Sequence, residues 1–161
     1  MKTGILERIL IRRYGQPVSC IRDGMAAKRW NSDEPDREAS LYFGMRWHGR
    51  LGLRFAALRD IYGDSFGGVL IKNILRAAIL APLQLFAVWN IDELQMQPAV
   101  QHALVKDPAI DFFMDEANVL FYGIKAGKLY VFDSETDELE CLGPCEPALE
   151  RLLDELESAR L

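Results

Sequence analysis

The stretch "NVLFYGIKAGKLYVFDSETDELECLGP", Asn118–Pro144, decides the fold of this 161-residue chain. It contains three runs typical of β-strands, "NVLFYGI", "KLYVFD" and "ELECLG". The connections between them, "KAG" and "SETD", are short enough for hairpins. Within the middle run, Tyr130, Val131 and Phe132 alternate between the two faces that an antiparallel strand presents. The stretch therefore predicts a three-stranded antiparallel meander.

A closing helix is predicted after Gly143. Pro147 suits the first position of a helix, because the missing N–H has no partner there. Apolar residues then recur at helical spacing and form one stripe, which consists of Leu149, Leu152, Leu153 and Leu156. Such a helix can cover one face of the meander.

Upstream of the meander, the pattern mostly predicts helices. They are expected at residues 5–14, 53–62, 69–80, 90–96 and 99–106, with strands at 41–47 and 83–89 and an exposed loop at 31–40. Half of the residues are hydrophobic, so the chain can bury a sizeable core. We predict one α+β domain over residues 1–161, with an antiparallel β-meander in the C-terminal half packed by helices and a closing C-terminal helix.

Charge is spread unevenly along the chain. The net charge is −5, but residues 1–80 carry 14 Lys and Arg against 8 Asp and Glu, whereas residues 81–161 carry 5 against 16. The acidic half would repel phosphates, which argues against nucleic acid as its direct ligand and favours a basic protein partner. The alternative is that these acids serve only solubility.

No membrane segment or export signal is expected. The apolar run Val69–Trp89 has the length of a membrane span, but Lys72 and Arg76 interrupt it, and each would cost roughly 2.5–3.5 kcal/mol in a bilayer. Glu7 and Arg8 interrupt the N-terminal apolar run too early for a signal peptide. Together with an odd, sparse set of three cysteines, this favours a reducing, cytoplasmic setting.

The acidic turn resembles the start of a calcium-binding loop, and then departs from it. Asp133, Glu135 and Asp137 alternate as EF-hand ligands do, but Glu138 replaces the glycine at the sixth position and Pro144 the glutamate at the twelfth. We instead expect Asp133 to end a strand and to bond the backbone of its own turn. The acids are then the tip of a hairpin.

The remaining residues give no motif for catalysis, metals or cofactors. Cys141 and Cys145 would need two more zinc ligands, and Cys20, His48 and His102 form no second closely spaced pair. Cys141 is expected to point inward as a small hydrophobe. No nucleophile elbow or phosphate-binding loop is present in the sequence, so we predict no catalytic residue, no metal ligand and no cofactor.

A basic, tryptophan-containing stretch runs from Arg46 to Arg59. It could meet phosphates, but its spacing shows no regular basic face, which favours a solvated surface. A match within the molecule between this stretch and the acidic half would also explain it.

Asp111–Pro144, with the leucine-striped helix that follows, resembles the SUKH superfamily, which includes bacterial immunity proteins and a fungal regulator of glucan synthesis. The shared order is a phenylalanine-rich lead, a strand with glycine, a "ly-fD--tgev" hairpin and a closing helix. "LFAVWNIDEL", Leu85–Leu94, is similar to the strand that runs into an acidic helix start in the family, and "LRFAALRDIYGDSFGG" is more loosely similar to its helix ending in a glycine turn. The resemblance thus lies in the C-terminal half.

This resemblance implies a non-enzymatic, protein-binding module, of the immunity type, that neutralises a cognate toxin. A toxin that handles nucleic acid is usually basic and would suit an acidic surface. The expected partner-binding residues are Asp133, Glu135, Asp137, Glu138 and Glu140. The alternatives are a small regulatory or scaffold protein of the same fold, a small enzyme with a dispersed site, or a binder of nucleic acid or membrane surfaces through Arg46–Arg59 or Val69–Leu80.

Overall fold

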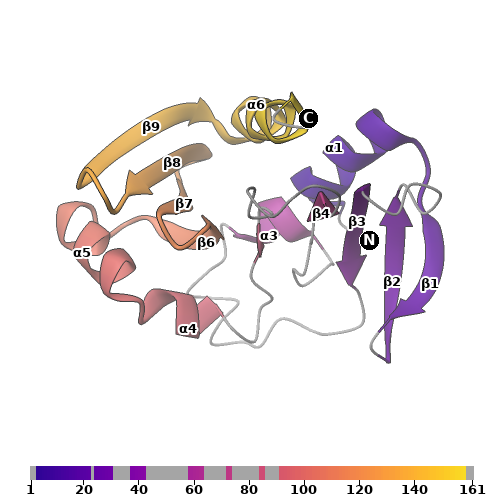
Figure 1. The fold of residues 1–161 in the computed structure, drawn as a ribbon, viewed down its shortest axis with the longest axis horizontal. Coiled ribbons are helices and arrows are strands. Elements are labelled where there is room, and N and C mark those ends of the chain that lie inside the picture. The colour runs from indigo at the N-terminus through magenta and orange to yellow at the C-terminus, as the bar shows by residue number, and fades with distance from the viewer. Residues whose placement is uncertain are drawn as a thin grey trace.

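Two antiparallel sheets and the helices around them build the protein (Figure 1). The computed structural model describes residues 3–22, 24–30, 37–42, 58–63, 72–73, 84–85 and 91–158. The first sheet has the strand order β1-β2-β3-β4, with β1 Val18–Arg22, β2 Met25–Trp30, β3 Arg37–Tyr42 and β4 Lys72–Asn73. The second has the order β5-β6-β7-β8-β9, with β5 Gln84–Leu85, β6 Asp111–Glu116, β7 Leu120–Lys125, β8 Lys128–Asp133 and β9 Glu138–Pro144.

The described helices lie on different sides of these sheets. They are α1 Ile5–Tyr14, α3 Leu58–Tyr62, α4 Ile91–Gln95, α5 Pro98–Lys106 and α6 Cys145–Ser158. In Figure 1, α4 and α5 lie on one side of the second sheet, and α6 lies on the other side next to α1. The fold class is therefore α+β, as predicted.

The predicted meander is confirmed as β7, β8 and β9, and β6 extends it by a fourth consecutive strand. The β7–β8 connection places Ala126 and Gly127 at φ values of 51° and 74°. Two successive residues at positive φ match the right-handed twist of hairpin strands, and glycine adopts this conformation at no steric cost.

The two faces of the meander belong to two cores. One face joins a core with α1, α6 and the first sheet, whose buried members include Leu10, Trp30, Leu41, Tyr122, Ile124, Leu129 and Leu149. The other face joins a core with α4 and α5, which consists of Leu94, Val100, Ala103, Ile110, Phe112, Phe121 and Phe132. The alternation predicted for β8 therefore places its side chains in both cores, one on each face.

Several predictions for the first half were wrong. β1 and β2 were not predicted at all, and β3 includes residues 37–40 of the predicted loop. Lys72 and Asn73 form β4, within a segment predicted to be helix, because strand pairing with β3 overrides the local helical pattern. The remainder of predicted segments 31–40, 41–47, 53–62, 69–80 and 83–89 lies mostly outside the described residues.

Two predictions near the C-terminus need correction. Helix α6 begins at Cys145, so Pro147 is its third residue and still lies in the first turn, where no helical N–H is needed. Cys141 is exposed on β9 instead of buried.

Candidate functional site

The β8–β9 turn is closed by its own backbone, as predicted. Asp133 ends β8, and its Oδ1 accepts hydrogen bonds from the N–H groups of Glu135 at 2.9 Å and Thr136 at 3.4 Å. The N–H of Asp137 donates to the carbonyl oxygen of Asp133 at 2.8 Å. Asp133 therefore shapes the turn.

The five predicted acids do not form one cluster, because the hairpin distributes them over different sides. Asp137 turns toward α5, where its carboxylate lies 2.6 Å from His102 Nε2 and 3.4 Å from Lys106 Nζ. Desolvation opposes the shift, but His102 and Lys106 together hold the pKa of Asp137 below its usual value. Glu135 is exposed at the tip.

The other three acids face α6. Asp133 pairs with Leu120 of β7 on one side and with Glu138 of β9 on the other. The next rung on the same face joins Tyr122, Val131 and Glu140. Each rung therefore begins with an apolar or aromatic residue on β7 and ends with a glutamate on β9.

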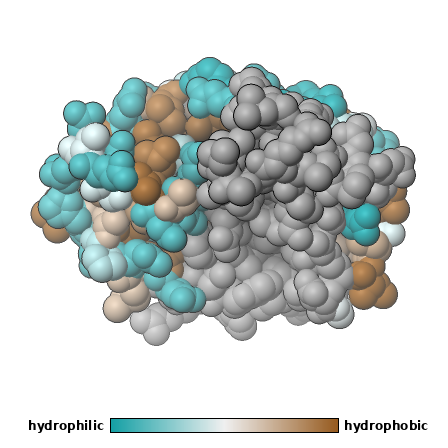
Figure 2. Space-filling model, viewed as in Figure 1, coloured by the Kyte–Doolittle hydropathy of each residue, from teal (hydrophilic) through white to brown (hydrophobic). Residues whose placement is uncertain are grey.

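A groove of about 300 Å³ lies between this face and α6. Its apolar lining comes from β7, β8, β9 and α6, and its charged lining comes from Asp133, Glu138, Glu140, Arg151 and Glu155. Figure 2 shows hydrophobic surface, in brown, bordered by hydrophilic surface, in teal, over the end of the molecule that holds β8 and β9. We call this groove, with its apolar and charged lining, the hairpin groove.

Two polar side chains at the hairpin groove already donate hydrogen bonds within the molecule. Arg151 Nη2 donates to the carbonyl oxygen of Leu142 at 2.7 Å, which positions the guanidinium at the β9 side. Tyr122 donates its hydroxyl to Glu116 Oε2 at 3.2 Å. Burial, with a contribution from Glu116 and Glu155, raises the pKa of Tyr122, so its phenol stays protonated.

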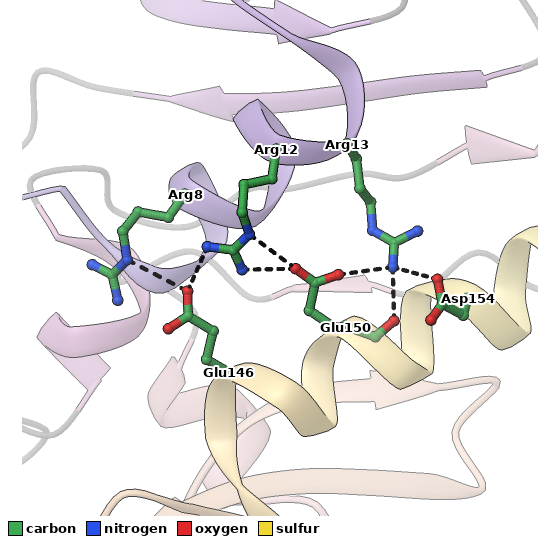
Figure 3. Close-up of polar contacts among 6 residues, drawn as sticks. All are labelled: Arg8, Arg12, Arg13, Glu146, Glu150 and Asp154. Carbon is green, nitrogen blue, oxygen red and sulfur yellow. Dashed lines mark hydrogen bonds and ion pairs between the residues drawn. The ribbon is translucent and has the colours of Figure 1, made fainter.

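A second group of acids, on α6, forms ion pairs with arginines of α1 (Figure 3). Arg12 of α1 lies 3.0 Å from Glu146 and 2.7 Å from Glu150, and Arg13 lies 3.1 Å from Glu150 and 2.6 Å from Asp154. We call these contacts, with the 3.5 Å pair of Arg8 and Glu146, the arginine ladder. Sequence reasoning missed it, although acidic residues off the leucine stripe and arginines on the first helix were visible signals.

The described residues provide little for catalysis or metal binding. No three His, Cys, Asp or Glu side chains gather as a metal ion would require, within the part of the chain that the structure describes. Burial raises the pKa of Cys145 to about 12, so the thiol is a poor nucleophile near neutral pH. His48 and most of the Arg46–Arg59 stretch lie outside the described residues, and Arg59 is exposed on α3.

Among the described helices, none combines the length and the apolar character that a membrane span needs. A scan against protein-family models gives no match. Searches of curated proteins and of solved structures give no significant match either.

Proposed function

We propose that this protein is a non-enzymatic, protein-binding module of the immunity type, which neutralises a basic toxin through the end of its β8–β9 hairpin. One observation carries the proposal: Glu135, Glu138 and Glu140 are exposed, and none forms an ion pair within the described part of the chain. By contrast, Glu146, Glu150 and Asp154 of α6 are held by arginines of α1. The hairpin therefore presents three exposed carboxylates, unpaired within the described residues, to a partner.

The SUKH resemblance supports the same function. The four strands β6–β9 and the closing α6 follow the order of elements that this resemblance implies. We propose that the protein acts in the cytoplasm, where a toxin that attacks nucleic acid would find its target.

The test begins with capture of partners from a lysate of the native organism. Each captured protein is expressed in a bacterial host, alone and together with this protein. We expect one of them to arrest growth alone and to be neutralised on co-expression. If no captured protein impairs growth, the immunity proposal is wrong.

Charge reversal then tests the surface. Glu138→Lys should slow association with the captured toxin by about tenfold at low salt and much less at high salt, because long-range attraction is screened. Glu93→Lys, which makes the same charge change at an exposed position of α4, serves as the control. Equal association rates for both variants at low salt would show that the hairpin is not the contact surface.

A further inference from the structure

We infer that the hairpin groove receives the side chain of a lysine or arginine from a protein partner, with its aliphatic stem on the apolar lining and its cation between Asp133, Glu138 and Glu140. The inference rests on the proposed function only for the source of that side chain. The shape and charge of the groove support the other parts of the inference.

The first argument is the charge of the groove. Four carboxylates and one guanidinium line it, so its net charge is −3 when all are ionised. Arg151 donates a hydrogen bond to the carbonyl oxygen of Leu142 and forms no ion pair with the described carboxylates. A cation from outside would therefore meet Asp133, Glu138 and Glu140, for which no ion pair is present among the described residues.

The second argument is the placement of two carboxylates on neighbouring strands. Asp133 and Glu138 stand directly opposite each other across β8 and β9. Like charges directly opposite each other destabilise a hairpin. Since Asp133 Oδ1 is used by the turn, its other oxygen remains available to share a cation with Glu138.

The third argument is the apolar part of the groove. Leu120, Val131, Leu142 and Leu152 are only partly buried, and all four line the groove. A small metal ion would leave this surface exposed to water, whereas the methylene stem of lysine or arginine would cover it. The combination of an apolar floor and an acidic edge fits a long cationic side chain.

The test is an NMR titration of the full chain, with methyl groups labelled. The probes are lysine and arginine with acetylated amino and methylamidated carboxyl groups, and norleucine capped in the same way as the uncharged control. We expect both cationic probes to shift the methyl signals of Leu120, Val131 and Leu142 in a saturable manner, and norleucine to leave them unchanged. Absence of saturable shifts with the cations, or equal shifts with norleucine, would overturn the inference.

Matched variants locate the site. Glu138→Gln should weaken binding of capped lysine by about threefold, and the double variant E138Q/E140Q by about tenfold. Glu135→Gln makes the same change at the tip, outside the groove, and should leave binding unchanged. Equal weakening by Glu135→Gln and Glu138→Gln would mean that the probes respond to general surface charge, and would overturn the groove as the site.

Three further outcomes test the source of the cation and separate this inference from the proposed function. Tighter binding of spermidine than of a pentapeptide with a central lysine would overturn the protein source of the cation. Saturable binding of the capped cations without any captured toxin would support the groove and overturn only the immunity proposal. Conversely, toxin neutralisation that depends on Glu138, without binding of any capped cation, would overturn only the groove.

Discussion

Gly123 of β7 leaves no room for a side chain. A Cβ at this position would overlap Cγ2 of Ile110 and would lie 3.1 Å from the carbonyl oxygen of Asp111 and 3.2 Å from Cα of Phe112. Ile110 is only 2% exposed and belongs to the core under α4 and α5. Because such interiors are close-packed, this neighbour cannot move freely.

Gly123→Ala should therefore lower the free energy of unfolding by about 1–3 kcal/mol, as overpacking of a core does. Urea denaturation followed by circular dichroism measures this change. Thr136→Ala, at the exposed turn, is the control and should change stability by less than about 0.5 kcal/mol. Equal stability of Gly123→Ala and the parent protein would contradict this close packing around Gly123.

The exposed Cys141 and the buried Cys145 should differ strongly in thiol reactivity. Burial is the main cause that raises the pKa of Cys145 to about 12, with smaller contributions from Glu146 and Asp60. In a Cys20→Ser background at about pH 8, a maleimide should label Cys141 rapidly and Cys145 only after unfolding. Mass spectrometry over time gives both rates, and rapid labelling of Cys145 in the native protein would contradict its burial.

Local chemistry was enough to predict the role of some residues but not the burial of others. The role of Asp133 followed from its place between a strand and a polar turn, because its hydrogen bonds are local. The exposure of Cys141 did not follow, since alternation alone cannot show how far α5 covers the face of β9. The burial of Glu7, which pairs with Lys28 of β2 at 2.5 Å, likewise depends on a distant strand.

At the scale of elements, the arginine ladder joins α1 to α6. Arg13 is its most enclosed member, with a side chain that is 13% exposed, and it also donates to the carbonyl oxygen of Glu150 at 2.8 Å. The Arg8 side chain is 45% exposed, and its contact with Glu146 is longer, at 3.5 Å. Removal of an enclosed, multiply bonded arginine costs more stability than removal of one from an exposed pair.

We expect Arg13→Gln to destabilise the protein by about 2 kcal/mol, because the partly buried carboxylate and the carbonyl oxygen of Glu150 lose this enclosed donor. Arg8→Gln, the exposed counterpart on the same helix, should cost less than about 0.5 kcal/mol. Urea denaturation of both variants tests the ranking. An equal effect of the two substitutions would show that enclosure of Arg13 has no energetic importance.

The ladder should also make stability depend on acid pH. Desolvation opposes the shift, but hydrogen bonds from Arg12 and Arg8 hold the pKa of Glu146 below its ordinary value of 4.5. A carboxylate with a lowered folded-state pKa contributes stability that is present above about pH 4.5 and is lost as pH falls through the folded-state value. Arg12→Gln should therefore flatten the decline of stability below pH 4.5, measured by urea denaturation over pH 3–7; an unchanged decline would contradict this role.

Elements were predictable where their pattern was local. The meander has short connections, and α1 has an amphipathic pattern and ends at Gly15 as the sequence suggests. The strand β2, "MAAKRW", was not predictable, because it has no β-branched residue and its strand state comes from pairing with β1 and β3.

For the whole molecule, the decisive feature is that the two sheets share one core. Leu10 of α1 is 1% exposed in this core, together with Trp30 of β2 and Leu129 of β8. No sequence pattern shows which helix touches which sheet, so neither this core nor the hairpin groove was predictable. An internal charge match with the acidic half occurs at α1, in the arginine ladder. The match expected for Arg46–Arg59 stays a prediction, since most of that stretch lies outside the described residues.

Leu10→Ala should lower the opening free energy of amides in both sheets by a similar amount, about 2–5 kcal/mol, because the cavity lies in the shared core. Native-state hydrogen exchange of β2 and β8 amides measures this effect. Val105→Ala, at a position 82% exposed on α5, is the control and should leave both unchanged. Loss of protection in β2 alone would show that the sheets open separately.

The pairing of α1 with α6 also bears on the order of events during synthesis. Arg12 and Glu150 are 138 residues apart in the chain, so α1 leaves the ribosome long before its partner helix exists. Until then, Leu10 and its neighbours on α1 lack the cover that α6 provides, whereas the consecutive hairpins of β6–β9 can assemble as they emerge. Nascent chains stalled before α6 should accordingly recruit chaperones through α1, and release them once α6 docks.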